Sequence, residues 1–532
     1  MNIPTTSASA YAACLAALLL ATAVVYTYRL DSAPVYVAPD EAHFAAHASA
    51  LAEHGTDLNG HRLPVFFRIT DPLVPDDAMR VWYQPTLFYL LAATFSFLPV
   101  TEASARLPVV VLGVANVCLM FLVGRRLFKS DRGALLGAAA LAMTPAHFLF
   151  SRQAVDYICP LPFVLGWLWC LLGYQQTRQQ RYLSGAMLLL GAGLFTYISS
   201  WAVMPLLGIF TLIAVKPGRR AVVQGVVAFA LPTIALLPWL LRHDQVLSDI
   251  IARYGLVAPA GTLVNSTRSW LDFNLAERVS LYWNYFNPSF LFFAGGGDLM
   301  MATSRAGVFL LPLAPLVAWG TYTLWKRRSV EAAVLLCGFY AAPLPIVLAL
   351  PETPQSSIGR ALTMVVFGVL IAMIGAQELW HRPAVSARAG VVALLLLMPL
   401  QFLVFRADYL SAYQERSAVR FDPFAMRDVM GAILDIERRT TVPLILINDD
   451  GDNKAIRWKF YTLKHQRADL WSRTKYFRVD SLDSAGPPMG SLLLMAANDP
   501  RSEKLLAAGC SRIAVVDGRG GQPATDIFRR DR

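Results

Sequence analysis

The sequence is poor in charged residues for its length. Asp, Glu, Lys and Arg make up only 16% of the 532 residues, while 56% are hydrophobic. Soluble globular chains rarely have this balance, in which apolar residues far outnumber the charged ones that normally cover a surface. The composition therefore excludes an ordinary soluble domain and indicates a polytopic membrane protein.

Paired cysteines are also missing. The six cysteines are scattered and show no CxxC spacing (Cys14, Cys118, Cys159, Cys170, Cys337 and Cys510). Most of them fall inside apolar runs, which is typical of buried, unreactive thiols. We therefore expect neither a cysteine-based metal site nor a disulfide framework.

Repeats, low-complexity linkers and a cleavable leader are absent as well. The chain shows no internal period of 20 to 50 residues. Its first apolar run, from Ala8 to Tyr28, lacks the basic start and the small-residue cleavage site of a signal peptide, so we expect a retained first span. The net charge of +11 comes from short basic clusters between apolar runs. This placement is typical of signals that orient spans, and it argues against a nucleic-acid partner.

Eleven apolar runs have about the length of a membrane span. They lie near residues 8–28, 106–124, 133–150, 157–174, 182–200, 201–215, 221–241, 305–325, 329–350, 361–380 and 389–405. A further stretch, Trp82 to Val100, fits either a span or a helix lying at the membrane interface. If it does not cross, the basic clusters all fall on one side (Arg125/Arg126/Lys129/Arg132, Arg178/Arg181, Lys216/Arg219/Arg220, Lys326/Arg327/Arg328 and Arg382/Arg388). The positive-inside rule makes that side the cytoplasm, so we expect about 11 transmembrane helices.

This threading predicts two domains, one embedded in the inner membrane and one outside it. Residues 1–405 form an all-α membrane domain, whose first exported loop is residues 29–105. Residues 406–532 form an extracytoplasmic tail with many charges, in which β-rich runs such as 442–447 and 513–516 alternate with helical patterns. We expect this tail to fold as a small α/β domain.

An acidic pair, Asp40 and Glu41, follows the first span. A helix beginning near Pro39 would place Asp40, His43 and His47 on one face, with Glu41 turned aside. In one interpretation Asp40 is a general base that takes the proton of an acceptor hydroxyl. In a second, Asp40 and the two histidines bind a metal ion. In a third, Asp40 only caps the helix and the histidines are surface residues.

Other charged and aromatic residues occur in the exported turns. Arg152 and Asp156 lie in a short turn between two spans, where charges usually pair with each other or face a cavity. Arg360 opens a later span, where an arginine either binds a phosphate by two hydrogen bonds or snorkels to the membrane surface as an anchor. Tyr83 belongs to a stretch of cations and aromatics, which is expected where anionic headgroups are met.

The order of these segments resembles that of the GT-C glycosyltransferases. The matching segments are Pro39-Asp40-Glu41, Tyr83 to Leu90, Arg106-Leu107-Pro108, Ser151 to Asp156, Asn287 to Phe292 and Arg360-Ala361-Leu362. The resemblance covers roughly residues 10 to 405. It is strongest to glycosyltransferase family 39 and its bacterial relatives, which include protein O-mannosyltransferases and the aminoarabinose and galacturonic acid transferases of lipid A.

The resemblance implies an activity and a set of site residues. Such enzymes move a sugar from a polyprenyl-phosphate carrier to a lipid or protein acceptor outside the membrane, usually with inversion. By this resemblance the catalytic residues are Asp40, as the base, and the adjacent Glu41, and the substrate-binding residues are Arg152, Asp156, Arg360, Tyr83 and His43. No cofactor is expected, although a divalent metal stays open as an alternative. The tail lacks the β-trefoil of eukaryotic protein mannosyltransferases, which leaves the acceptor open.

A polytopic transporter or lipid flippase is the rival interpretation. Transporters usually contain internal repeats with helices broken at the membrane midplane. Neither is evident in this sequence, and a long first loop with a folded tail fits an enzyme better. The sugar itself is set by the shape of the pocket and cannot be read from motifs.

Overall fold

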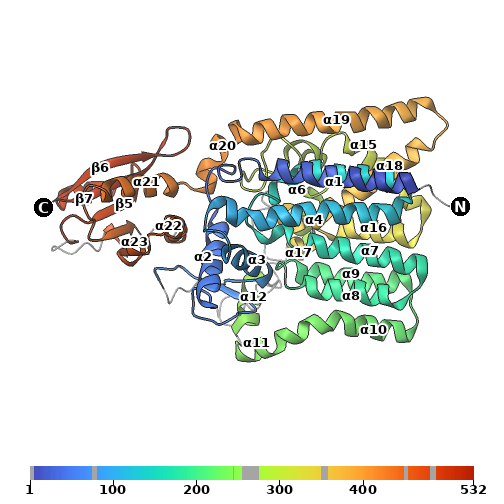
Figure 1. Ribbon diagram of the computed structural model, residues 1–532, viewed down its shortest axis with the longest axis horizontal. Coiled ribbons are helices and arrows are strands. Elements are labelled where there is room, and N and C mark those ends of the chain that lie inside the picture. The colour runs from blue at the N-terminus through green and yellow to red at the C-terminus, as the bar shows by residue number, and fades with distance from the viewer. Residues whose placement is uncertain are drawn as a thin grey trace.

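The chain forms a bundle of helices with a small α/β domain at one end (Figure 1). The computed structural model describes residues 5–74, 81–243, 245–254, 275–348, 358–448, 453–479 and 487–531. We call the end of the bundle that carries the α/β domain the domain end, and the opposite end, where α1 begins, the N-terminal end.

Long helices make up the bundle. They are α1 (Thr5–Thr27), α4 (Glu102–Phe128), α5 (Asp131–Met143), α7 (Leu161–Thr177), α8 (Gln180–Gly193), α9 (Ser200–Val215), α10 (Arg219–Ala230), α15 (Leu313–Arg327), α16 (Val330–Ala341), α18 (Thr363–Trp380) and α19 (Val385–Leu410). Each of the eleven predicted runs carries one of these helices. Seven helical segments of the described chain are long and apolar enough to cross a membrane. The prediction of a polytopic, integral membrane fold is therefore confirmed.

The stretch from Trp82 to Val100 contains a separate short helix, α3 (Pro85–Phe95). It begins at a proline in the first helical position, which is pre-organised for a helix start. In Figure 1, α3 lies beside α2 (Pro39–His54) at the domain end of the bundle. This placement agrees with the prediction that the stretch does not cross the membrane.

Basic clusters mark helix ends at the N-terminal end of the bundle. Helices α4, α7, α9 and α15 are each followed by a basic residue in the left-handed conformation (Lys129, Arg178, Lys216 and Arg328). A left-handed residue ends a helix, and a cation there interacts favourably with the helix dipole. Figure 1 shows the α9–α10 and α18–α19 connections at this same end.

Helix α18 is the centre of the bundle, and its residues from Thr363 to Ala376 are buried. It packs closely against α15 because glycines lie where the two backbones approach. A Cβ atom added to Gly320 would collide with the carbonyl oxygen of Ile371, and one added to Gly375 would collide with that of Leu316. Small residues at helix contacts allow this close packing inside membranes.

Shorter elements cover the domain end of the bundle. They are the antiparallel pair β1 (Phe67–Ile69) and β2 (Val81–Tyr83), and the helical segments α6 (Pro145–Phe150), η1 (Asp156–Ile158), η2 (Leu231–Ala235), α11 (Leu236–Arg242), α12 (Gln245–Tyr254), α14 (Leu275–Asn284), η3 (Ser289–Ala294), α17 (Leu344–Leu348) and η4 (Ile358–Ala361). Helices α6, η1 and η4 contact one another, although η4 follows η1 by some 200 residues.

The tail is the predicted α/β domain. Its sheet has the order β4-β3-β5-β7-β6, with β3 parallel to β4 and β5, and β7 antiparallel to β5 and β6. The elements are α20 (Ala412–Phe421), α21 (Met426–Glu437), β3 (Ile445–Asn448), α22 (Lys454–Lys464), α23 (Ala468–Ser472), β4 (Thr474–Phe477), β5 (Leu492–Ala496), α24 (Ser502–Ala507), β6 (Cys510–Asp517) and β7 (Pro523–Arg530). Helix α19 runs to Leu410, so it passes the expected boundary at residue 405.

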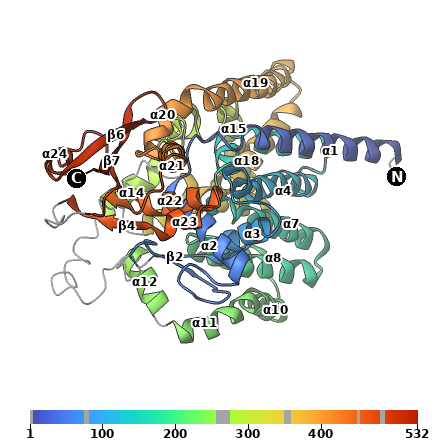
Figure 2. The ribbon, with the colours of Figure 1, turned by 60° about the vertical axis from the view of Figure 1, so that its left-hand side comes forward.

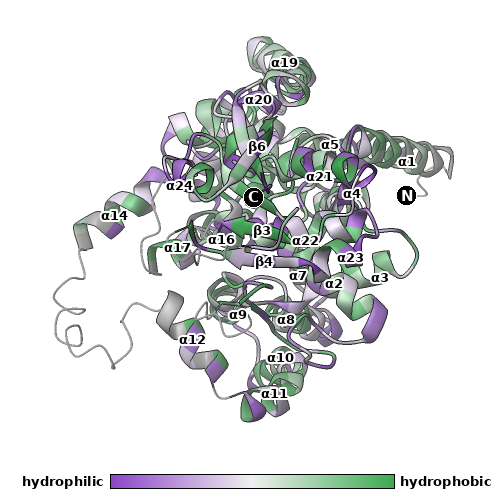
Figure 3. Ribbon diagram, turned by 90° about the vertical axis from the view of Figure 1, so that its left-hand side faces the viewer, coloured by the Kyte–Doolittle hydropathy of each residue, from purple (hydrophilic) through white to green (hydrophobic). Residues whose placement is uncertain are grey.

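The α/β domain is held to the bundle by charged contacts. Glu102, at the first turn of α4, is buried and accepts from Arg427 at 2.7 Å and from Lys464 at 2.8 Å. The Tyr36 hydroxyl donates to Asp428 at 2.7 Å. Figures 2 and 3 show α22 of the domain beside α2, and the two helices are in contact. The domain therefore packs directly on the loop that carries the acidic pair.

Candidate active site

The acidic pair starts helix α2 at the domain end of the bundle. Pro39 is the first helical residue, and Glu41 accepts a hydrogen bond from the Ala38 backbone N–H at 3.0 Å. The helix ends at Gly55, whose φ of 69° and N–H bond to the Leu51 carbonyl form a left-handed cap. These local signals fix where the helix begins, and so which way the two acidic side chains point.

Asp40 is half-buried and is held by a tyrosine. The Tyr83 hydroxyl, at the end of β2, donates to Asp40 Oδ1 at 2.9 Å. The ring of Phe44, one turn further along α2, packs 5.4 Å from the Tyr83 ring. The strand pair and the helix therefore fix the Asp40 carboxylate together. Of the predicted site residues, Tyr83 and Asp40 are in direct contact.

Glu41 points the other way, into the protein. Its side chain is 1% exposed and forms an ion pair with Arg106 of α4, with Oε1 lying 2.9 Å from Nε. Oε1 also accepts from the Ala154 backbone N–H at 2.8 Å. The prediction listed Glu41 with the catalytic residues, whereas its geometry is that of a residue that positions α2. Buried carboxylates need such partners because an uncompensated charge in a low-dielectric site is costly.

Arg152 also has a different environment from the predicted one. It is fully buried and donates to the main-chain carbonyl oxygens of Tyr26, at the end of α1, and of Tyr28 and Ala33 in the segment that follows. Its guanidinium lies 5.3 Å from the Phe148 ring. The guanidinium therefore joins this segment to the turn after α6, instead of presenting its charge to a phosphate. The sequence pattern predicted either a substrate contact or a pair with Asp156, and Arg152 instead binds the main chain.

Asp156 and Arg360 come together with Asp40. Asp156 begins η1 and is 5% exposed, and its carboxyl lies within electrostatic range of both Asp40 and Arg360. Arg360 is half-buried on η4, which packs against η1. The structure thus brings three of the predicted residues, from loops far apart in the sequence, to one place at the domain end. The turn of residues 351–357 that precedes η4 lies outside the described residues.

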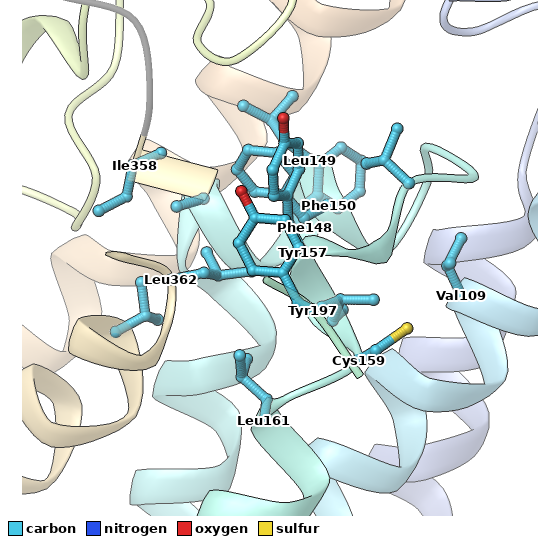
Figure 4. Packing of buried hydrophobic residues seen from close by; sticks show 14 of the residues in the cluster. Val109, Phe148, Leu149, Phe150, Tyr157, Cys159, Leu161, Tyr197, Ile358 and Leu362 are labelled. Atoms are coloured by element: carbon cyan, nitrogen blue, oxygen red, sulfur yellow. The ribbon is translucent and has the colours of Figure 1, made fainter. Parts of the chain in front are cut away.

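Aromatic side chains pack around the two short helices, η1 and η4, that carry Asp156 and Arg360. Tyr157 packs edge-on against Tyr197 at 5.0 Å and against Phe150 at 5.4 Å. Figure 4 shows these rings packed together with Ile358 and Leu362 around η4. A Cβ atom on Gly359 would lie 3.0 Å from the Tyr157 ring, so the glycine allows η4 to approach η1 closely. This packing fixes the backbones that carry Asp156 and Arg360.

The histidines of α2 face the α/β domain and the interior. His43 is 3% exposed and lies near Asn453 and Arg457 of the domain. Burial, with a smaller effect of the neighbouring His47, lowers the pKa of His43 to about 3. Burial likewise lowers the pKa of His47 to about 4. Both rings are therefore neutral at pH 7, and His43 lies against the domain, a different setting from the predicted contact with substrate.

A metal site was one interpretation of Asp40, His43 and His47. Within the described ranges, no group of three or more His, Cys, Asp or Glu side chains is close enough to hold a metal ion. His47 instead lies edge-on to the rings of Phe67 and Phe88, at 5.9 and 5.7 Å. The three side chains therefore do not converge as the helical spacing predicted.

Arg106 is a residue that the sequence reasoning did not assign to the site. It is fully buried, and besides its bonds to Glu41 it donates to the carbonyl oxygens of Leu30, Pro34 and Tyr36 at 2.9 to 3.0 Å. The sequence does contain a pattern that points to Arg106, because an arginine at the start of an apolar span requires a counter-charge. The preceding loop holds several acidic residues, and the tertiary structure brings Glu41 to Arg106.

Comparisons with known proteins agree with this architecture. Residues 83–241 match a family model described as dolichyl-phosphate-mannose-protein mannosyltransferase. A comparison with curated proteins gives no match. Among solved structures, the chain is similar to ArnT from Cupriavidus metallidurans in the apo state, with a TM-score of 0.63 and 14% identity over 98% of each chain.

A second structure of the same protein, bound to undecaprenyl phosphate, is similar with a TM-score of 0.59 and 14% identity. It covers 96% of this chain and 97% of that one. Similarity at this level of identity shows a common fold over almost the full length of both chains. The chain thus has the GT-C membrane fold, of the kind seen in ArnT, and the prediction of that fold is confirmed.

Proposed function

We propose that this protein is a membrane glycosyltransferase that transfers a sugar from a polyprenyl-phosphate carrier to an acceptor hydroxyl, with Asp40 as the general base. One observation carries the proposal. Asp40, fixed by Tyr83, lies with Asp156 and Arg360 at the domain end of a GT-C fold. The family match and the ArnT structure solved with undecaprenyl phosphate support a lipid-linked donor.

The reaction requires one proton acceptor and stabilisation of one leaving group. The acceptor oxygen attacks the anomeric carbon of the sugar while the bond from that carbon to the phosphate oxygen breaks. Asp40 takes the proton of the acceptor hydroxyl, and the electron pair of the broken bond stays on the phosphate. A single displacement of this kind inverts the anomeric configuration.

Arg360 is the cation that we assign to the phosphate. Charge develops on the leaving phosphate in the transition state, and a fixed guanidinium stabilises that charge through two parallel hydrogen bonds. Arg360 is half-buried beside Asp156, whereas Arg152 is already bonded to main-chain carbonyls. Asp156 lies within electrostatic range of both Arg360 and Asp40, so we assign it to the same substrate-binding site.

The position of the site suits a lipid-borne donor. The carrier chain remains in the membrane, while its phosphate and sugar project to the level of the headgroups. Helix α2 lies between the bundle and the α/β domain (Figure 1), and η1 and η4 contribute Asp156 and Arg360 to the same site. We propose that this end of the protein is extracytoplasmic, because the basic clusters lie at the opposite end. The acceptor is then a lipid or protein hydroxyl on the outer face.

A donor-release assay tests the proposal. Purified full-length protein is incubated with single polyprenyl-phosphate sugars and a membrane lipid extract or a peptide mixture, and free polyprenyl phosphate is measured. We expect release with one donor, a product of inverted configuration by NMR, and a loss of 10²–10⁴-fold in Asp40→Asn. The matched control is Asp31→Asn, because Asp31 is an exposed residue of the same loop.

The other outcomes are equally informative. Near-normal release by Asp40→Asn removes the base assignment. No release with any donor, combined with movement of a lipid-linked sugar across vesicles containing the protein, would establish a flippase instead.

A further inference from the structure

A groove opens at the N-terminal end of the bundle, opposite the candidate active site. It has a volume of about 710 Å³ and lies between the α4–α5 connection, the last turns of α18 and the first turns of α19. The residues that line it include Lys129, Arg132, Leu136, Trp380, Val392 and Leu395. Ligand pockets in proteins commonly have volumes of about 300–1,000 Å³.

The rim of the groove carries two cations that form no ion pair with any residue the structure describes. Lys129 and Arg132 are both exposed there, and Arg132 Nε donates to the neutral hydroxyl of Tyr11 at 3.0 Å. The carboxylates close to the rim are paired with other cations. Asp131 lies 2.7 Å from Arg125 and Glu378 lies 2.6 Å from Arg327, and neither arginine lines the groove.

The walls below the rim are apolar and open to the membrane. Leu136 of α5 and Val392 of α19 are 45% and 42% exposed, and Leu395 and Met373 continue the apolar surface. Trp380, 48% exposed, stands beside them at the end of α18. An aromatic ring with one polar edge suits the boundary between acyl chains and headgroups.

We propose that this groove binds an anionic phospholipid of the leaflet at the N-terminal end of the bundle. The headgroup phosphate would contact Lys129 and Arg132, and an acyl chain would lie along Leu136, Val392 and Leu395. The two cations favour a net negative headgroup over a zwitterionic one, because the ammonium group of the latter offsets the attraction. The proposal does not depend on the activity at the other end of the protein.

The test uses delipidated, full-length protein in detergent. Binding of phosphatidylglycerol and of phosphatidylcholine is measured separately by native mass spectrometry at increasing lipid concentration. We expect one molecule of phosphatidylglycerol to bind more tightly than any further phosphatidylglycerol molecules. It should also bind more tightly than any molecule of phosphatidylcholine. Lys129→Ala/Arg132→Ala is expected to weaken that binding about 30-fold, since each of the two cations near an anionic lipid contributes about 1 kcal/mol.

A charge-matched control separates the groove from the general charge of this face. Arg219 and Arg220 are exposed at the same end of the bundle and do not line the groove, so Arg219→Ala/Arg220→Ala should keep the tight lipid. Val392→Trp places a large side chain in the groove without removing charge, and it should displace the lipid. Three outcomes would overturn the proposal. They are an equal loss of phosphatidylglycerol affinity in the two double variants, equal affinity of the wild type for the two lipids, and unchanged phosphatidylglycerol binding by Val392→Trp. Stronger binding of polyprenyl phosphate than of phosphatidylglycerol would overturn the choice of a phospholipid.

Discussion

Glu41 and Arg106 form an ion pair that is closed to solvent, with 2.9 Å between Oε1 and Nε and 3.1 Å between Oε2 and Nη2. Because Glu41 directly follows Asp40 in the chain, this pair fixes the start of α2 on α4. The position of the candidate base therefore depends on a contact between the loop after α1 and helix α4 of the bundle.

Breaking this pair should destabilise the protein. Glu41→Gln leaves the buried Arg106 charge without its counter-charge, and we expect a loss of roughly 3–5 kcal/mol. The measurement is the midpoint of thermal unfolding in detergent. Glu53→Gln is the matched control, because Glu53 lies on the same helix with a side chain that is 59% exposed. The double variant Glu41→Leu/Arg106→Met should recover part of the lost stability. Equal unfolding midpoints for Glu41→Gln and Glu53→Gln would contradict the role of the pair.

Removing the hydroxyl that holds Asp40 should slow transfer without abolishing it. Tyr83→Phe loses a hydrogen bond to a charged group, which corresponds to roughly a tenfold lower kcat/KM. The hydroxyl stabilises the ionised carboxylate, so the acidic limb of the pH–rate profile should move to higher pH. Tyr89→Phe is the control, because the Tyr89 hydroxyl donates to the Pro64 carbonyl at 3.0 Å. An unchanged pH profile in Tyr83→Phe would separate Tyr83 from the base.

Arg360→Ala should mainly affect the lipid donor. Loss of a guanidinium from the phosphate is expected to raise the apparent KM for the donor about 10- to 100-fold, with partial retention in Arg360→Lys, which keeps the charge but not the planar fork. Initial rates at varied donor concentration give this value. Arg62→Ala, which removes an exposed arginine of the loop between α1 and α4, serves as the control. A donor KM equal to that of the wild type would exclude the phosphate role.

The contact between α2 and the α/β domain should weaken in mild acid. Burial lowers the pKa of His43 to about 3 and that of His47 to about 4, whereas an unfolded chain binds these protons near pH 6.5. The unfolded state therefore takes up more protons as the pH falls below 6.5, and stability falls with it, by roughly 2 kcal/mol per histidine down to pH 5.

Thermal unfolding between pH 7.5 and 5 measures this effect. The decrease of the unfolding midpoint with falling pH should be smaller in His43→Gln/His47→Gln than in the wild type. It should persist in His54→Gln, because the His54 side chain is 71% exposed. A slope that is the same in all three proteins would assign the acid sensitivity to other groups.

The two ends of the bundle should be accessible from opposite sides of the membrane. Gly297 precedes Asp298, which pairs with Arg420 of the α/β domain at 2.9 Å, while Lys326 lies in the last turn of α15. In a Cys14→Ser background, Gly297→Cys should react with an impermeant maleimide from outside intact cells and Lys326→Cys only after permeabilisation. Labelling of both from one side would contradict the threading.

Much of the fold follows directly from patterns in the sequence. Apolar runs of span length, broken by basic clusters, predicted the positions of the bundle helices, and Lys129 and Arg178 indeed follow the ends of α4 and α7. The run at residues 442–447 became β3 of a small α/β domain. These predictions succeeded because span length and strand composition are local properties, set by the thickness of a membrane and by the pleat of a sheet.

The candidate site depended much more on tertiary contacts. The sequence selected Asp40, Asp156 and Arg360 as charged residues in exported turns, but their meeting depends on the packing of η4 against η1, far away in the chain. Arg152 and His43 were selected for the same local reason, as charged or titratable residues in these loops, but the structure gives them other surroundings. Arg152 is bonded to the main chain after α1, and His43 lies under the α/β domain.

By itself, the sequence determined that this is a polytopic membrane protein with a folded tail and that its acidic pair directly follows the first span. Only the tertiary structure decided which of two adjacent carboxylates is buried in an ion pair and which is held half-exposed beside a tyrosine. The reason is physical, because a charged side chain takes its role from its partners and its burial. Those are properties of the packed bundle, and no local pattern contains them.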